Sequence, residues 1–73
     1  MNLERFNIDR CHLCQSNENI TPYLIEWSVS RPDILSFCNE GTCKHRFSTS
    51  HDTARLTKLT LEEAKVLIVK SNL

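Results

Sequence analysis

Glycine, proline and long apolar runs are scarce in this sequence of 73 residues. Gly41 is the only glycine and there are two prolines, so neither a low-complexity segment nor an interdomain linker is expected. The longest apolar run covers residues 66–69, far short of the roughly 18 residues of a membrane-spanning helix. The first ten residues contain no apolar segment typical of a secretory signal. We therefore expect a single cytoplasmic domain over residues 1–73, with no membrane partner.

The sequence also lacks an excess of charge of either sign, with nine basic and nine acidic side chains. Proteins that bind nucleic acid mainly by electrostatic attraction are usually strongly basic, so this balance argues against indiscriminate binding. Between residues 41 and 60, however, Asp52 is the single acidic residue. We expect any contact with a polyanion or a partner to lie there, and an ordinary solvated surface is the alternative. The candidate contact residues are Lys44, Arg46, Arg55 and Lys58.

Motifs for catalysis are missing as well. The chain has no serine-nucleophile motif, no glycine-rich phosphate loop and no second carboxylate pair. His51 and Asp52 are adjacent, but a lone His-Asp pair in a polar segment is typical of a turn or a helix start. We therefore expect that the protein is not an enzyme.

What the sequence does contain is two close pairs of cysteines, Cys11 with Cys14 and Cys38 with Cys43. Each pair is too short for a typical disulfide loop, and a reducing cytoplasm favours metal binding over disulfides. Two turns that each present two thiolates can close a tetrahedral Cys₄ zinc site, which leaves no position for a catalytic water. The sequence therefore predicts one structural Zn²⁺ ion. Disulfides and another metal centre, such as an iron–sulfur cluster, are the alternatives.

Two histidines lie close to these cysteines. His12 is inside the first pair, where its side chain is expected to point away from a metal that its neighbours hold. His45 could replace Cys43 as a ligand only if the second loop were unusually wide. A chain this short rarely buries enough apolar surface to fold well unaided, and a structural zinc supplies roughly 10–16 kcal/mol of apparent binding energy.

Short apolar stretches around both cysteine pairs predict strands. Strands on each side of one metal are typical of a zinc ribbon, so we expect short antiparallel strands, two cysteine knuckles and a core of about residues 5–50. Gly41 lies inside the second knuckle, where a sharp turn with positive φ suits glycine. A turn is expected at residues 31–33. The predicted strands cover residues 6–8, 23–30, 34–37 and 44–49.

The aromatic residues fit a core around this site. Tyr23 and Trp27 alternate with polar residues along the same strand face as Ile25 and Val29, which predicts core packing. If that face were exposed, stacking on bases or on a partner would be the alternative. Phe37 and Phe47 flank the second cysteine pair and are expected to pack over the zinc site.

The last part of the chain predicts a helix over about residues 60–71. Thr60 and Glu63 have the spacing of a capping box, in which each side chain binds the backbone N–H of the other residue. Two apolar faces are expected on this helix, which exceeds what packing on one small ribbon requires. Self-association or binding of a partner protein is therefore a hypothesis for it. One face holds Leu61, Ala64, Leu67 and Ile68, and the other holds Val66, Val69 and Leu73.

The pattern Cys-x₂-Cys-x₂₃-Cys-x₄-Cys resembles the Ogr/Delta family of temperate-phage zinc-finger transcription activators. In those proteins the fourth cysteine begins the pattern Cys-x-x-x-Phe-x-Thr, and here Phe47 and Thr49 fall at these offsets from Cys43. The family's asparagine between the last two cysteines falls one position earlier, at Asn39. The resemblance covers roughly residues 11–55 and does not extend to the capped helix.

This resemblance implies one zinc ion per chain, held by Cys11, Cys14, Cys38 and Cys43. It also implies activation of phage or prophage late promoters, through contact with DNA and with the α subunit of the host RNA polymerase. We therefore expect a small zinc-binding transcription regulator. A zinc-stabilised protein-interaction module, such as an inhibitor or adaptor, is the main alternative, and an RNA-binding protein that acts on translation is a third.

Overall fold

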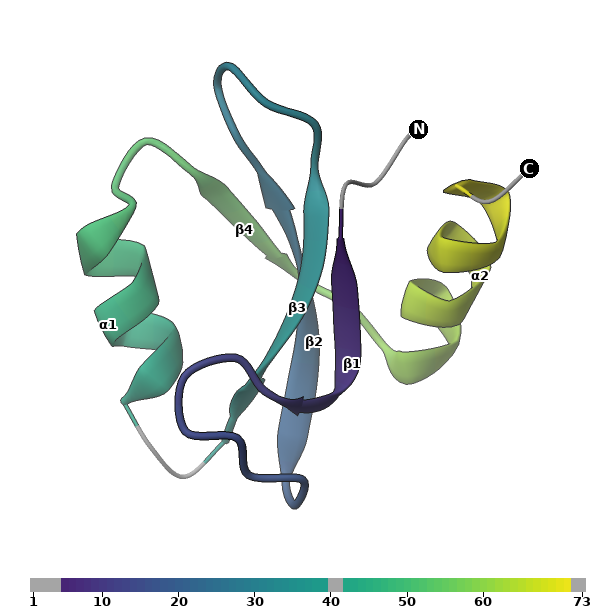
Figure 1. The fold of residues 1–73 in the computed structure, drawn as a ribbon, viewed down its shortest axis with the longest axis horizontal. Helices are drawn as coiled ribbons and strands as arrows, with labels where there is room; N and C mark the ends of the chain where they lie inside the picture. Colours follow the sequence, from purple (N-terminus) through teal and green to yellow (C-terminus); the bar gives the residue numbers. More distant parts are fainter. Residues whose placement is uncertain (1–4, 40–41, 72–73) are drawn as a thin grey trace.

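The computed structural model describes residues 5–39 and 42–71 of the chain. Four strands form one sheet in the order β1-β3-β2-β4, and a helix lies on each side of it (Figure 1). In chain order the elements are β1 (Phe6–Cys11), β2 (Ile20–Glu26), β3 (Asp33–Cys38), α1 (Cys43–Ser50), β4 (Arg55–Lys58) and α2 (Leu61–Ser71).

The centre of the sheet is the antiparallel pair of β2 and β3, whose register runs from Ile20 opposite Cys38 to Ile25 opposite Asp33. These strands correspond to the two predicted between residues 23 and 37. The prediction that Val29 belongs to the core is wrong, because β2 ends at Glu26 and Val29 is 93% exposed. On the outer side of β2 lies β4, also antiparallel, so the sheet extends beyond the ribbon expected to end near residue 50.

The strand β1 pairs in parallel with β3, with Phe6 opposite Ile34 and Asn7 opposite Leu35. The expectation of antiparallel pairing throughout is therefore wrong for this pair. The ladder is interrupted between Asn7 and Cys11, which lies opposite Ser36. Within this interruption the side-chain Oδ1 of Asn7 accepts hydrogen bonds from the N–H groups of Asp9 and Arg10.

The segment predicted as a strand over residues 44–49 is the helix α1, and this prediction is wrong. Its two buried residues are Cys43 and Phe47, four positions apart and therefore on one face of a helix. A strand would also have turned His45 toward the core, whereas His45 is exposed here. The polar composition of the segment suits a helix that touches the sheet along one narrow face. Gly41 lies outside the described residues, so its predicted turn is not observed.

Each face of the sheet carries its own apolar core. Because helices cover both faces, the central strand β3 is buried along almost its whole length. Successive residues of β2 point to opposite faces, so Ile25 packs under α1 while Leu24 packs under α2. The core under α1 contains Cys11, Ile25, Leu35, Phe37, Cys43 and Phe47. The core under α2 contains Leu24, Ile34, Leu59 and Ala64.

The C-terminal helix α2 and its capping box are confirmed. The Thr60 N–H donates to the Glu63 carboxylate at 3.0 Å, and the Glu63 N–H donates to the Thr60 hydroxyl at 3.1 Å. Ala64 is fully buried against the sheet, whereas Val66 and Val69 face outward. Leu73, assigned to the same outer patch, lies outside the described residues. Neither described helix is long and apolar enough to cross a membrane.

Replacing Thr60 with alanine is expected to lower the free energy of unfolding by about 1 kcal/mol, because the Glu63 N–H loses its acceptor at the first turn of α2. Urea unfolding followed by circular dichroism measures this change. The Thr60→Ser variant keeps the hydroxyl and should remain close to the original stability. An equal loss in both variants would show that the capping hydrogen bond does not stabilise α2.

Candidate metal centre

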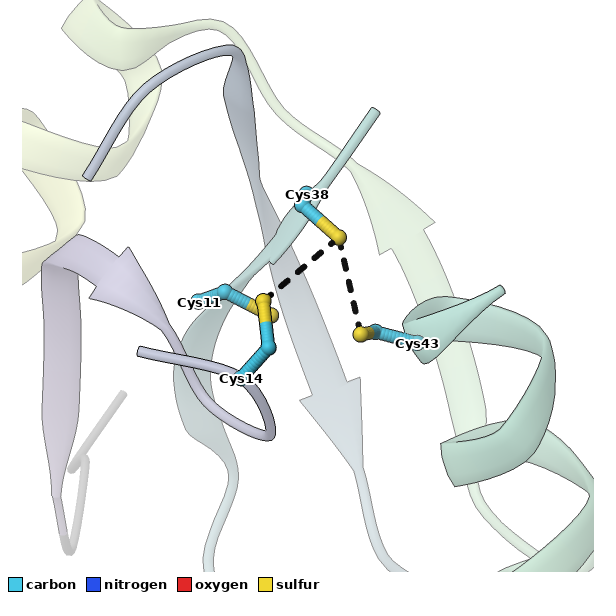
Figure 2. Close-up of side chains that lie close together, drawn as sticks. All are labelled: Cys11, Cys14, Cys38 and Cys43. Atoms are coloured by element: carbon cyan, nitrogen blue, oxygen red, sulfur yellow. Dashed lines mark hydrogen bonds between the residues drawn. The ribbon is translucent and has the colours of Figure 1, made fainter. Parts of the chain in front are cut away.

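The ends of two strands, one turn and the start of a helix bring the cysteines to one end of the sheet. Cys11 is the last residue of β1 and Cys38 is the last residue of β3. Because the two strands are parallel neighbours, their carboxyl ends meet at the same edge, which an antiparallel pair would not allow. Cys14 lies in the turn after β1, and Cys43 is the first residue of α1. Figure 2 shows the four side chains converging from these elements.

The spacing of the sulfur atoms fits one tetrahedral metal ion. All four Sγ atoms lie within 4.8 Å of one another. The Sγ atoms of Cys14 and Cys38 are 3.8 Å apart, and those of Cys38 and Cys43 are 3.5 Å apart. Thiolates bound to zinc at about 2.3 Å in a tetrahedron lie about 3.8 Å from one another. A disulfide would require about 2.05 Å, and all four cysteines are free thiols.

Backbone amides around Cys11 favour its thiolate form. Burial of this side chain raises its pKa, but hydrogen bonds from the backbone N–H groups of Cys14, Cys38 and Leu13 outweigh burial and lower the pKa to about 6. An N–H group that points at a sulfur stabilises negative charge there, as it does in metal-binding knuckles. Cys11 is therefore prepared to bind a cation.

The neighbouring thiols cannot all ionise in the absence of a cation. The hydrogen bond between the Cys43 thiol and the Cys38 sulfur, which Cys43 can donate only while protonated, acts together with burial to raise the pKa of Cys43 to about 12. The pKa of Cys14 is also raised: the N–H of Ser16 lowers it, but the Cys11 side chain, desolvation and Cys38 together outweigh that effect. A divalent cation would release the remaining protons, because thiolates are the ligating form. The donor set thus suits a metal ion better than it suits four neutral thiols.

Neither nearby histidine belongs to this group. The His12 ring packs edge-on against Phe37 and Phe47, with centroids 6.2 and 5.6 Å away. Burial and the nearby Arg5 lower its pKa, so the neutral ring packs as an aromatic group. His45 is exposed on α1. In the described part of the chain, the four cysteines form the one cluster close enough to hold a metal ion.

Phe37 and Phe47 pack beside the cysteines, in the same buried cluster as Cys11 and Cys43. Their ring centroids are 5.1 Å apart. Tyr23 and Trp27 are half-buried against this cluster, as predicted for core residues. The protein therefore shields one side of the metal centre with aromatic rings.

Three polar contacts were not predicted, two of them beside the site and one at the far end of β3. The Thr21 hydroxyl donates to Oδ1 of Asn39 at 2.5 Å, and the Asn39 N–H donates to the Asn19 carbonyl at 2.6 Å. These bonds tie the start of the second knuckle to the start of β2. Asp33, predicted as part of a turn, is the first residue of β3, is buried and accepts a hydrogen bond from Nε1 of Trp27 at 3.0 Å. A single acidic residue beside an apolar stretch carries no signal for such a contact.

The four basic candidate residues do not form one patch. Lys44 Nζ lies 5.7 Å from the centroid of the Tyr23 ring. Lys58 is directly opposite Tyr23 on β4, so these side chains share the face of the sheet that α1 covers. Arg46 is about 200° from Lys44 around α1 and faces elsewhere. Arg55 lies opposite Glu26, on the other face of the sheet.

The protein is therefore a small domain with a four-stranded sheet, and its four clustered cysteines can hold one metal ion. No known protein family, curated protein or solved structure matches this chain.

Proposed function

We propose that the four cysteines bind one zinc ion, and that this ion is structural. The donor set is all thiolate, and four protein ligands close the tetrahedron, so no open position remains for a catalytic water. Zinc fits this set because Zn²⁺ is a borderline-soft ion that binds thiolates well and is four-coordinate and tetrahedral in structural sites. An iron–sulfur cluster is disfavoured, because several atoms would have to fit between sulfurs that lie within 4.8 Å of one another.

Protein purified from cells is expected to contain one zinc ion per chain and to be colourless. Elemental analysis gives the stoichiometry, and replacement of zinc by Co²⁺ should give the intense visible bands of a tetrahedral cobalt–thiolate centre. The Cys14→Ser variant should show a weaker thiolate band than the original protein. Iron as the main metal, or less than half an ion per chain after zinc supplementation, would contradict the proposal.

We further propose that the zinc-bound domain is a small regulator of transcription that contacts promoter DNA and bacterial RNA polymerase. Two features support this proposal: the resemblance around Cys43 and Phe47, and the position of Lys44 and Lys58 on the face of the sheet that carries α1. The second feature is the structural support for the proposal, because Lys44 and Lys58 lie on the same face as Tyr23. A net charge of zero fits a regulator that obtains much of its affinity from polymerase.

The experiment is a selection of duplex DNA from a random-sequence pool by zinc-loaded protein together with purified bacterial RNA polymerase. Enrichment of one sequence, followed by protection of that DNA beyond polymerase alone, is the expected result. If no sequence is enriched over a polymerase-only selection, the proposal fails. Single-stranded RNA of the same sequence distinguishes an RNA-binding function.

In that complex, the double variant Lys44→Ala/Lys58→Ala is expected to weaken DNA binding by about ten-fold and to reduce the salt dependence by about two phosphate contacts. Fluorescence anisotropy at several salt concentrations measures both quantities. Arg55→Ala is the matched control, because Arg55 lies on the opposite face of the sheet. An equal effect of Arg55→Ala would place the DNA elsewhere.

A protein-interaction module without nucleic-acid contact is the second candidate. The observation that favours it is the separation of Arg46 and Arg55 from Lys44 and Lys58, so these four residues do not form a continuous basic surface. Binding to immobilised RNA polymerase without DNA, combined with the absence of any salt-sensitive DNA binding, would support this candidate over the first.

A further inference from the structure

The outer face of α2 carries a ridge of three residues at four-residue intervals: Glu62, Val66 and Lys70. Residues spaced in this way form a nearly straight row along a helix. Val66 is 50% exposed, and the neighbouring Val69 is 60% exposed. We call Glu62, Val66, Val69 and Lys70 together the α2 ridge. Figure 1 shows α2 beside β1, with the sheet between it and α1, so neither α1 nor the sheet covers the outer side of α2.

The charges of the α2 ridge have no partner within the described residues. The one ion pair in this part of the chain joins Arg5 to Asp33. Glu63 is used by the capping box, but Glu62 makes no such bond. The ridge therefore presents a carboxylate at its first end, an apolar centre and an ammonium group at its last end.

This order of charges is self-complementary. If two copies of the ridge meet across a two-fold axis at Val66, Glu62 of each copy faces Lys70 of the other, and the two Val66 side chains meet at the centre. The antiparallel arrangement also places each helix N-terminus near the C-terminus of the other helix, which the helix dipoles favour. The charges of the lysine, arginine, aspartate and glutamate side chains sum to zero, and four thiolates on one Zn²⁺ add only about −2, so long-range repulsion between two copies is weak.

The surface of the α2 ridge continues onto the sheet through a hollow of about 440 Å³ between β1 and α2. Phe6, Ile8, Ile68 and Val69 give this hollow an apolar lining, and Asn7, Asp9 and Lys65 line it as well. Phe6 is 48% exposed, and β1 is an edge strand of the sheet. This surface enlarges the contact area beyond the two valines, which alone would be far below the roughly 800 Å² per partner of a typical stable interface.

We propose that the α2 ridge binds the same ridge of a second copy of this chain, in an antiparallel two-fold arrangement. A different partner protein would need its own cation opposite Glu62 and its own carboxylate opposite Lys70. A second copy that runs antiparallel supplies both by symmetry. The interaction does not depend on nucleic acid or polymerase, so it can be tested separately from the proposed function.

Sedimentation equilibrium of the zinc-loaded full chain over a range of concentrations is the test. A reversible monomer–dimer equilibrium is expected. Val66→Glu should abolish the measurable dimer, because two carboxylates would meet at the axis. Val29→Glu is the matched control, because Val29 is 93% exposed on the loop between β2 and β3 and should leave the equilibrium unchanged.

Charge reversal tests the arrangement itself. Glu62→Lys and Lys70→Glu should each weaken the dimer by about ten-fold, because each places like charges at both ends of the ridge. The double variant Glu62→Lys/Lys70→Glu should restore it, since both pairs are re-formed with opposite signs. The proposal is overturned if the original protein stays monomeric to about 1 mM. It is also overturned if Val29→Glu weakens the dimer as much as Val66→Glu, or if the double reversal restores nothing.

Discussion

A strong chelator is expected to unfold the zinc-loaded protein. Two of the six residues of the buried cluster under α1 are the cysteines Cys11 and Cys43, so this core and the metal centre form one unit. Apparent binding energies for structural zinc are about 10–16 kcal/mol. The net stability of a domain of this size is about 4–11 kcal/mol at the usual value per residue. Loss of the ion therefore removes a free energy at least comparable to the whole net stability of the domain.

Circular dichroism and the emission of Trp27, the single tryptophan, should both change together on chelation. Zinc added back in excess should restore both signals, whereas Mg²⁺ should not, because it prefers oxygen ligands. The Cys38→Ser variant should behave like the chelated protein even in the presence of zinc. Native dichroism that persists after complete zinc removal would show that apolar packing alone maintains the fold.

Replacing Phe47 with alanine is expected to lower the free energy of unfolding of the zinc-loaded protein by about 3–5 kcal/mol. Phe47 is only 3% exposed and is, with Cys43, one of two buried residues of α1. Its ring lies 5.1 Å from the Phe37 ring and stacks on His51 at 4.4 Å. The cavity left by alanine would therefore adjoin the metal centre, and α1 would lose one of its two buried contacts with the sheet.

Denaturant unfolding at saturating zinc measures this loss, and Trp27 emission reports it locally because the two rings are 6.0 Å apart. The Phe47→Leu variant keeps most of the volume and should lose about 1.5 kcal/mol or less. A loss below 1 kcal/mol for alanine would show that Cys43 and the metal hold α1 in place without the aromatic ring.

The features that sequence predicted correctly are those encoded within a few residues. Thr60 and Glu63 are three positions apart, and their reciprocal hydrogen bonds form as expected. Each cysteine pair likewise lies within a short loop, so the clustering of the four sulfurs follows once the two loops meet. The alternation around Tyr23 and Ile25 identified β2, although it extended the strand past Glu26.

The features that sequence missed depend on partners far along the chain. Cys43 and Phe47 are four positions apart, a spacing that places both on one face of a helix or on one face of a strand. Only the packing of α1 against β3 decides between these states. The parallel pairing of β1 with β3 joins Phe6 to Ile34, and no local pattern in either segment specifies that neighbour.

The charged residues show a similar limit. Lys44, Arg46, Arg55 and Lys58 are close in sequence, which suggested a common surface. The turn between α1 and β4 and the alternation along β4 instead separate Arg55 from Lys58 onto opposite faces of the sheet. Composition therefore identified the segment, whereas the fold determined which of its side chains can act together.

The parallel pair of β1 and β3 also constrains the order in which the chain can fold. The β2–β3 hairpin joins neighbouring segments and can form early, whereas β1 must dock on the far side of β3, with Cys11 and Cys38 27 positions apart. Closing such a loop is slow because of its entropy. A metal ion captured by the first pair of cysteines and then by the second would act as a temporary tether across that loop. Refolding is therefore expected to be faster when zinc is present from the start than when it is added after the chain has collapsed.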